Sequence, residues 1–376
     1  MNEPFSAAVI TVFICGDVMT GRGIDQILPH PSAPHIYEPY LRDARRYVEL
    51  AERVNGPISK PANLAYIWGD ALAVLERMAP DLRLINLETS ITTSNDYWRG
   101  KGINYRMHPA NIPVLGAARI DVCALANNHV LDWGYAGLAE TLRILHEANI
   151  SCAGAGRDLA EAAAPAVVEV SGKGRVLVFG FGAETSGIPA SWAAGADRPG
   201  VNLLLPDLSA ETLRPLLGRI RAMKRSGDLV VASLHWGGNW GYEIPRQQQE
   251  FAHRLVDGAG VDIVHGHSSH HVKGIEVYHG KPIIYGCGDF INDYEGIGGN
   301  EEYRGELSLM YFVRMEPVTG TLSALTMVPT RMKQFRIQRA SHAEAEWLRA
   351  TLEWEGKKFG TRVELAADAT LSLRWD

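Results

Sequence analysis

Short apolar runs alternate with longer stretches of helical spacing along the first two thirds of the chain. The runs are of strand length and lie at residues 8–14, 83–87, 122–126, 176–181, 229–234 and 261–264. The stretches in which apolar residues recur with helical spacing lie at 68–78, 134–148, 208–224 and 245–256. This repeated order of strand and helix predicts an α/β protein with a mostly parallel sheet and helices on its faces.

The last third of the chain has a different pattern, in which strands follow one another directly. Residues 274–278 and 282–285 flank the turn His279-Gly280-Lys281 and predict a β-hairpin. Antiparallel strands are expected at 307–314 and 321–328, and a helix at 343–352.

No linker, repeat or low-complexity segment interrupts the chain. We therefore expect one domain over residues 1–340, with a C-terminal helix and tail at 341–376 packed on it. The proline-rich stretch 28–61 shows no clear periodicity and predicts a long inserted loop near the site.

Composition and charge narrow the classes of protein that fit. Of the 376 residues, 46% are hydrophobic and 21% charged, which is typical of a globular chain and excludes a disordered, collagen-like or coiled-coil protein. The net charge of −6 provides no basic field for nucleic acid, and no apolar stretch approaches the roughly 20 residues of a membrane span. The N-terminus lacks the basic and apolar regions of a secretory signal, so we expect a cytoplasmic protein.

Side chains that can bind metal stand at the ends of five predicted strands: Asp17, Glu88, Asn128 with His129, His235, and His267 with His270 and His271. In an open α/β sheet the carboxyl ends of the strands line the crevice in which ligands bind. The set contains no thiolate, because the four cysteines are scattered without CxxC spacing. It predicts a site for a divalent cation of the Mn²⁺, Fe²⁺, Zn²⁺, Ca²⁺ or Mg²⁺ kind, whose identity the residue types leave open.

Six motifs occur in the order in which one protein family has them. They are Gly-Asp-Val-Met-Thr-Gly-Arg at 16–22, Asn-Leu-Glu at 86–88, Tyr-Arg-Met-His-Pro at 105–109, Asn-Asn-His-Val-Leu-Asp-Trp-Gly at 127–134, Leu-His-Trp-Gly at 234–237 and Gly-His-Ser-Ser-His at 266–270. With Lys281-Pro282 and the residues after them, these motifs resemble the CapA, or poly-γ-glutamate biosynthesis, family over about residues 10–290. That family is a branch of the calcineurin-like metallophosphoesterase superfamily. The resemblance implies a calcineurin-like α/β fold, in which two mixed β-sheets pack face to face between outer helices and the metal site lies at the strand ends.

The resemblance also implies roles for single residues. Glu88 resembles the carboxylate that bridges two metals in a phosphoesterase, and Asn128 resembles the amide ligand of the Asn-His motif. His129 resembles the acid/base histidine of that motif, which acts on the substrate without binding metal. His235 and His267 resemble metal ligands.

The first metal site departs from the phosphoesterase pattern. The superfamily carries Asp-x-His in its first motif, whereas here Met19 follows Asp17-Val18, so one ligand is missing. Two-metal hydrolysis needs cations roughly 3.5–4 Å apart, and a single metal is therefore easier to support.

Two further positions bear on the acid/base groups. His270 resembles a ligand or a base beside Asp17, but the sequence Gly-His-Ser-Ser-His-His leaves open whether His270 or His271 takes that place. Asp289 stands where the family usually has asparagine, and this carboxylate adds an acid/base or histidine-orienting group.

Two histidine–carboxylate combinations around one cation predict proton transfer on both sides of a substrate. His129 is one candidate proton carrier, oriented by Asp132, and His270 with Asp17 or Asp289 is the other. Some soluble relatives of the resembled family are epimerases of ribosomal precursor peptides, including lasso-peptide precursors. We therefore expect first a metal-dependent peptide epimerase that inverts a Cα centre from L to D. The alternatives are a hydrolase or biosynthetic enzyme of the poly-γ-glutamate or capsule type, a phosphoester hydrolase, and a non-catalytic accessory protein.

Candidate substrate-binding residues lie in the motif loops. Arg22 and Arg106 could hold a carboxylate with two hydrogen bonds, such as a peptide C-terminus or a glutamyl group. Trp236 and Trp240 could pack on a peptide side chain, although packing under loops would explain these aromatic residues equally well. The expected partner is a peptide or polyglutamyl substrate, and neither nucleic acid nor a membrane is expected.

Overall fold

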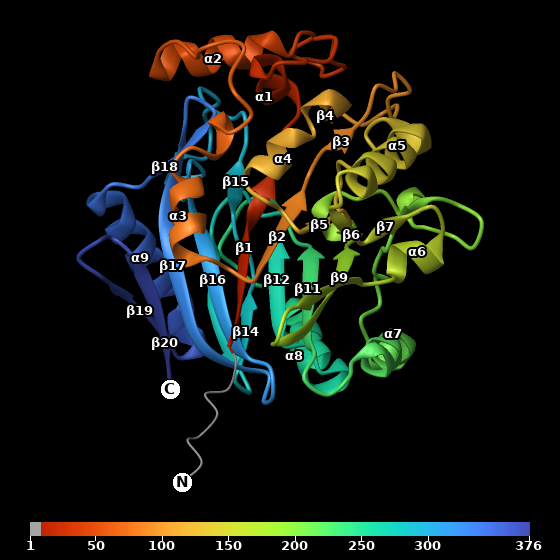
Figure 1. Cartoon of the computed structure of the whole chain (residues 1–376), viewed down its shortest axis with the longest axis vertical. Coiled ribbons are helices and arrows are strands. Elements are labelled where there is room, and N and C mark those ends of the chain that lie inside the picture. Colours follow the sequence, from red (N-terminus) through yellow and green to blue (C-terminus); the bar gives the residue numbers. More distant parts are fainter. Residues whose placement is uncertain (1–8) are drawn as a thin grey trace.

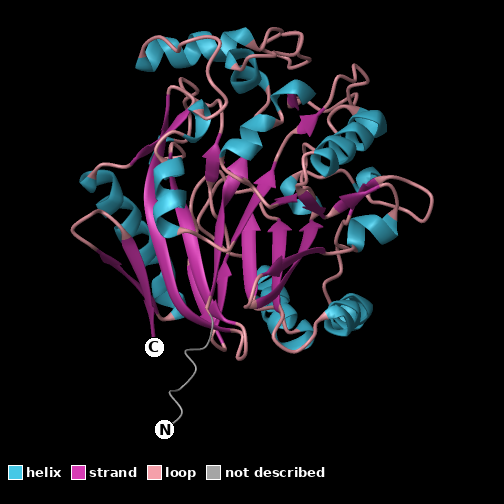
Figure 2. Ribbon diagram, viewed as in Figure 1, coloured by secondary structure: helices cyan, strands magenta, loops and turns pink. Residues whose placement is uncertain are grey.

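The computed structural model of the chain describes residues 9–376 and contains two mixed β-sheets that pack face to face, with helices outside them (Figures 1 and 2). This is the two-sheet arrangement that the resemblance implied, so the fold prediction is confirmed. The metal-binding side chains lie at one end of the two sheets, where several parallel strands finish.

The larger sheet has ten strands and combines parallel and antiparallel pairs. Its order is β19 (Thr361–Leu365), β20 (Leu371–Trp375), β17 (Thr321–Lys333), β16 (Leu307–Glu316), β1 (Ile10–Val18), β2 (Leu82–Leu87), β5 (Val122–Ala124) and β6 (Ser151–Ala153). Two more strands join it from the side, β15 (Asp289–Ile291) beside β1 and β18 (Arg336–Arg339) beside β17. The strands from β1 to β6 are parallel, whereas those from β16 to β19 pair antiparallel.

The smaller sheet has six strands with a parallel centre. Its order is β13 (Ile275–Tyr278), β14 (Lys281–Ile284), β12 (Ile263–His267), β11 (Leu229–His235), β9 (Gly174–Gly182) and β8 (Ala166–Val170). Only the edge strands β13 and β8 run antiparallel to their neighbours. Two short ribbons, β3 (Ser90–Ile91) with β4 (Arg106–Met107) and β7 (Ala155–Gly156) with β10 (Gly200–Val201), lie in the connections.

The alternation of side chains along the strands places apolar groups on both faces of each sheet. Ile10, Val12 and Ile14 of β1 pack with Leu229 and Val231 of β11 in the core between the sheets. The neighbouring residues of both strands belong to the two outer cores. Strands that are buried on both faces read as continuous apolar runs, as these do.

Helices cover the outer face of each sheet. The helices α1 (Arg22–Ile27), α2 (Arg45–Asn55), α3 (Ala71–Met78), α4 (Pro113–Ala117) and α5 (Gly134–Glu147) contribute to the outer core of the larger sheet. The helices α7 (Ala210–Met223) and α8 (Arg246–Ala259) cover the smaller sheet. The short α6 (Leu159–Ala163) contacts β7, and α9 (His342–Gly356) packs beside β19 (Figure 1).

The predicted elements occur with shifted boundaries. The first strand continues to Val18 and so includes Asp17, and residue 8 of its predicted range lies outside the described residues. The strand predicted at 261–264 begins at Ile263 and includes both His265 and His267. Polar side chains can extend these strands because they still satisfy the sheet hydrogen bonds and point into a site rather than into an apolar core.

Two segments differ from the prediction. The stretch 28–61 contains α2, because Tyr47, Val48 and Ala51 form one apolar side of a helix that packs on the outer core. The C-terminal segment contains α9 as expected, but also β19 and β20, and β20 pairs with β17. Val363, Leu371 and Leu373 of these strands are buried in the core between the sheets. Within residues 9–376, no helix combines the length and the apolar character needed to cross a membrane.

Candidate metal centre

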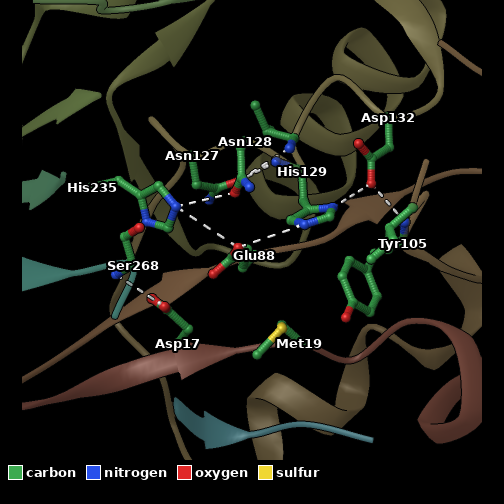
Figure 3. A network of polar contacts seen from close by, with 12 residues as sticks. Asp17, Met19, Glu88, Tyr105, Asn127, Asn128, His129, Asp132, His235 and Ser268 are labelled. Atoms are coloured by element: carbon green, nitrogen blue, oxygen red, sulfur yellow. Dashed lines mark hydrogen bonds and ion pairs between the residues drawn. The ribbon is translucent and has the colours of Figure 1, made fainter. Parts of the chain in front are cut away.

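Five strand ends meet at one edge of the two sheets. Asp17 lies near the end of β1, and Glu88 and Asn128 follow β2 and β5 in the larger sheet. His235 and His267 are the last residues of β11 and β12, and they are direct partners in the parallel register of the smaller sheet. Because the strands of both sheets end here, their side chains come together, and Figure 3 shows His235 of the smaller sheet facing Glu88 and Asn128 of the larger one.

Asp17, His235 and His267 form the most compact group of metal-binding side chains among the described residues. One ligand atom from each lies within 4.8 Å of the others, and all three residues are buried. The two Nδ1 atoms of His235 and His267 are 2.8 Å apart, so at most one proton fits between them. One carboxylate oxygen and two imidazole nitrogens form a donor set that suits a divalent transition metal.

Hydrogen bonds hold the carboxylate of this group in place. Asn86 donates from Nδ2 to Asp17 Oδ1 (2.7 Å), and the backbone N–H of Ser268 donates to Asp17 Oδ2 (3.1 Å). Partners of this kind around a ligand fix its orientation and thereby tune the affinity for metal.

A relay between the sheets holds His267, the second histidine of this candidate group. Ser233 Oγ lies 2.9 Å from His267 Nε2 and 3.1 Å from His265 Nδ1. His265 Nε2 in turn donates to the carbonyl oxygen of Cys15 in the larger sheet (2.7 Å). The relay leaves Nδ1 of His267 directed toward His235.

Glu88 and Asn128 flank this group. Glu88 Oε1 is 3.8 Å from His235 Nε2 and 3.7 Å from His129 Nε2, and Asn128 Oδ1 is 3.1 Å from His235 Nε2. Burial, together with the neighbouring carboxylates, raises the pKa values of Asp17 and Glu88 above their ordinary range. Buried carboxylates that repel one another are stabilised by a cation, so the charges of the site fit a bound divalent metal.

A histidine–carboxylate pair lies on one side of Glu88. His129 Nδ1 is 2.6 Å from Asp132 Oδ2, which also accepts the backbone N–H of Tyr105 at 2.6 Å. The ammonium group of Lys101 forms an ion pair with Asp132 Oδ1 (2.6 Å) and lies 3.0 Å from His129 Nδ1. Burial lowers the pKa of His129 to about 4, so the ring is neutral at pH 7.

A second pair involves His270 and a carboxylate. His270 Nδ1 is 2.8 and 3.0 Å from the two oxygens of Asp289, and Asn292 Nδ2 donates to Asp289 Oδ2 (3.1 Å). Burial acts to lower the pKa of His270, but the charge and hydrogen bond of Asp289 outweigh burial and the pKa is raised. Of the two carboxylates considered for His270, the structure pairs it with Asp289, whose strand partner in β1 is Asp17.

His271 points away from the metal group. Its Nδ1 donates to the carbonyl oxygen of Val272 (3.0 Å), and its ring stacks on Tyr303 in a cluster that also contains Trp240. The structure therefore brings His270, and not His271, to the site.

A cavity of about 730 Å³ opens beside the second pair. Its walls include residues of α2, the segment 292–306 and Trp240, and His270 and Asp289 also line it. The cavity is large enough for a small ligand or several residues of a linear chain, and it joins the site on the side of His270.

Both arginines among the four predicted substrate-binding residues already have partners within the chain. Arg22 is buried and donates to Asp293 with Nε (3.1 Å) and Nη2 (2.5 Å) and to Glu38 with Nη1 (2.9 Å). Arg106 donates to the carbonyl oxygens of Ser94 (2.8 Å) and Ala33 (3.2 Å) and lies over a tryptophan ring. In both cases the carboxylate or carbonyl partners come from this chain, which corrects the expectation of a free guanidinium.

The two predicted tryptophans have different surroundings. Trp236 is buried in the outer core of the smaller sheet, where Nε1 donates to the carbonyl oxygen of Tyr285 (3.0 Å). It therefore belongs to the packing rather than to a ligand pocket. Trp240 is 37% exposed, lines the cavity and lies 5.3 Å from the His270 ring.

Lys101 is the principal site residue that the sequence analysis missed. It lies between Gly100 and Gly102 in a loop without periodicity, and its partner Asp132 is distant in the sequence. The supporting residues Asn86, Ser233 and His265 were also missed. A usable signal was the period of two in β11 and β12, because Ser233 and His265 lie two residues before His235 and His267 and share their faces.

The two-sheet fold and its buried Asp/His/His group define a calcineurin-like α/β protein with a site that could hold a divalent metal. The chain belongs to the family described as bacterial capsule synthesis protein PGA_cap, which matches residues 11–294. This confirms the CapA-like family to which the motifs pointed.

Similar proteins carry names from polymer synthesis. The chain is 51% identical over 97% of its length, and 96% of the relative's, to a probable polyglutamine synthesis accessory protein from Mycobacterium tuberculosis (strain ATCC 25618 / H37Rv). It is 27% identical over 77% of its length, and 65% of the relative's, to the PGA biosynthesis protein CapA from Bacillus subtilis (strain 168). A solved structure, a novel phosphatase from Mycoplasma pneumoniae, aligns with a TM-score of 0.46 and 13% identity over 86% of this chain and 94% of its own.

These names match the alternative of a poly-γ-glutamate or capsule type of protein better than the expected epimerase. Nothing in the similarities supports the epimerisation of a lasso-type peptide. The family and the buried Asp/His/His group fit a metal-dependent enzyme or an accessory protein.

Proposed function

We propose that this chain is a metal-dependent amide hydrolase that cuts or releases polyglutamyl or polyglutamine chains during their synthesis. The observation that carries the proposal is the Asp17, His235 and His267 group with a histidine–carboxylate pair on each side. The names of the relatives support a polymer of glutamyl or glutaminyl units as the substrate.

Asp17, His235 and His267 would hold the cation, with Glu88 and Asn128 next to them. A divalent metal supplies a Lewis acid that polarises a carbonyl oxygen. The missing first-motif histidine, replaced by Met19, supports one metal rather than two.

The two histidines would divide the proton transfers. Asp132 accepts from Nδ1 of His129, which leaves Nε2 on the side of Glu88 able to accept a proton from the attacking water. His270, whose pKa Asp289 raises, would give a proton to the departing amine nitrogen. The C–N bond then breaks, and the products are a carboxylate and an amine.

Epimerisation remains a second candidate because two separate histidine–carboxylate pairs are present. In that reaction one histidine would remove the proton from Cα and the other would return a proton to the opposite face. The same residues would act, but no bond of the chain would be cut.

One assay separates these functions. The metal-loaded protein is incubated in D₂O with short γ-glutamyl and L-glutaminyl oligomers, and the products are analysed for new amino groups and for deuterium at Cα. We expect new amines in step with cleavage, no deuterium in uncleaved oligomer, and loss of cleavage in His129→Gln but not in His253→Gln, which changes a half-buried histidine on α8 that bonds Glu276.

The other results assign the alternatives. Deuterium gained at Cα without new amines would establish the epimerase. A metal-loaded protein that cuts neither oligomer, yet binds them, would be an accessory protein.

A further inference from the structure

The cavity beside His270 has unusually apolar walls for a site expected to meet a glutamyl polymer. Tyr40, Val54, Trp240 and Ile297 all line it, although they are 64%, 62%, 37% and 51% exposed. Large apolar side chains that gather in an exposed groove mark a place where a ligand covers them. The ligand that fits here therefore has aliphatic or aromatic surface.

The guanidinium groups of the cavity are already paired. Arg22 is held by Asp293 and Glu38 in a buried ion-pair network. Arg331 forms an ion pair with Glu344 at 2.8 Å. Among the described residues that line the cavity, these are the only arginines, and no lysine lines it.

Carboxylates outnumber these cations along the wall. Asp289, Glu295, Glu301 and Glu306 line the cavity; Asp289 pairs with His270 and Glu306 with Arg304, so Glu295 and Glu301 are the lining carboxylates without a cation partner among the described residues. Glu295 accepts from the backbone N–H groups of Gln334 (2.7 Å) and Phe335 (2.6 Å) in the turn before β18. A chain with a carboxylate on every residue would place like charges beside these groups, and such juxtaposition is unfavourable when water is excluded.

Neutral amide side chains, unlike carboxylates, are not repelled by the negative charges of this wall. A side-chain amide donates two N–H groups and accepts through its oxygen, so it can pair with Glu295 and Glu301 and with the lining amide of Asn300. Asn55 and Asn292 already donate to Glu295 and Asp289. The methylene groups between the amide and its backbone can cover Val54, Trp240 and Ile297. Apolar and amide surface together are what a glutamine side chain offers.

We infer that this cavity binds a run of residues with uncharged amide side chains, of the polyglutamine kind, and discriminates against poly-γ-glutamate. The inference rests on the proposed function for the position of the scissile bond, and it adds the class of side chain and the place where the chain lies. Trp240 and the end of α2 are the specificity-determining parts.

The test compares binding of matched oligomers to the metal-loaded full chain by isothermal titration calorimetry. The probes are hexamers of L-glutamine, of γ-linked glutamate and of L-alanine. We expect the glutamine hexamer to bind about tenfold more tightly than either of the others. The glutamate hexamer should bind less tightly because of its charge, and the alanine hexamer because it has no side-chain amide to pair.

A charge-adding variant links the preference to the cavity. Ile297→Lys adds a cation to the exposed wall and should strengthen binding of the glutamate hexamer about tenfold while changing the glutamine hexamer by less than about twofold. Val318→Lys adds the same charge in a distant exposed turn, since Val318 is 83% exposed, and should change neither.

Equal or tighter binding of the glutamate hexamer by the unaltered chain would overturn the inference, and so would equal binding of the alanine hexamer. An Ile297→Lys variant that behaves as Val318→Lys does would remove the cavity from the binding site and overturn it as well. Failure of the proposed function looks different, because tight glutamine binding without any bond cleavage would leave this inference intact. Cleavage of γ-glutamyl oligomers that bind as tightly as the glutamine hexamer would support the proposed function and overturn this inference.

Discussion

The two histidine–carboxylate pairs of the site have the same chemistry in opposite surroundings. His129 and Asp132 are buried, and the carboxylate of Asp132 also binds the ammonium group of Lys101 and the backbone N–H of Tyr105. His270 and Asp289 line a cavity of about 730 Å³. One pair is enclosed by protein, and the other faces the place where a substrate would lie.

The difference shows how neighbours decide the charge of a buried histidine. Burial lowers the pKa of His129 to about 4, and the ammonium of Lys101 adds to this effect by offsetting Asp132. Burial acts on His270 in the same direction, but Asp289 outweighs it and the pKa is raised. One site thus contains an imidazole whose pKa is lowered and one whose pKa is raised, which suits a base and an acid that work in the same reaction.

Removing a shared metal ligand should have the largest effect, because it disables both pairs at once. His235→Ala is expected to lose its bound metal and to lower the rate of oligomer cleavage more than about 10³-fold, since metal polarisation of a carbonyl contributes several kcal/mol. Metal content by mass spectrometry and cleavage rate are measured together. The matched variant His253→Ala removes an imidazole on α8 that bonds Glu276 and should retain both metal and activity. Full metal content in His235→Ala would contradict the proposed ligand set.

The walls around the two pairs should also differ in stability. Arg22→Met leaves Glu38 and Asp293 as buried carboxylates without their cation, which costs about 3–5 kcal/mol in the free energy of unfolding. Arg106→Met, near the enclosed pair, loses hydrogen bonds to carbonyl oxygens and should cost about 1–3 kcal/mol. Urea denaturation of both variants checks the order, and a smaller loss for Arg22→Met would contradict the role of this network in supporting the cavity wall.

The strand ends and the metal group could be predicted because they depend on local patterns. Each apolar run is short and ends in a polar residue, and parallel strands must bring such ends to one edge. His235 and His267 were named from the sequence as metal ligands and Asp17 as a partner of the base His270, and the three meet within 4.8 Å in the structure. Glu88 and Asn128, the other two predicted ligands, lie next to this group. The boundaries were less certain, since Asp17 and His267 continue their strands into the site instead of following them.

The cavity could not be predicted, because its walls come from segments that have no local signal for meeting. Val54 and Trp240 are nearly half the chain apart, and the helix that carries Val54 lies in a stretch whose flanking prolines concealed its short apolar period. The ion pairs of Arg22 could not be predicted for the same reason. Its motif suggested a ligand-binding guanidinium, and only the fold brings Asp293 and Glu38 within 3 Å of it.

Replacing each histidine separately should distinguish the two pairs. His129→Gln is expected to lower kcat about 10²-fold with little change in KM, since an enclosed base acts on the reaction and touches little of the substrate. His270→Gln should lower kcat and also raise KM, because this ring lines the cavity. Steady-state kinetics on the preferred oligomer gives both constants. Identical changes in the two variants would mean that enclosure makes no difference to their roles.

The smallest expected effect concerns the aromatic ring next to each histidine. Trp240 lies 5.3 Å from the His270 ring and is partly exposed, whereas Tyr105 lies 4.4 Å from His129 and is buried. Trp240→Ala should raise KM about three- to tenfold and leave kcat within about twofold, since an aromatic contact contributes roughly 0.5–1.5 kcal/mol beyond the area that it buries.

The control for this variant is Trp354→Ala, which removes a ring on α9 that is 75% exposed and should change neither constant. A fall in kcat with an unchanged KM in Trp240→Ala would mean that the ring holds His270 in position and does not touch the substrate. In that case the open pair would resemble the enclosed one, whose neighbouring ring Tyr105 is buried against His129. A rise in KM alone would support the difference between the two histidine–carboxylate pairs, because only a ring that faces the cavity can contact a bound chain.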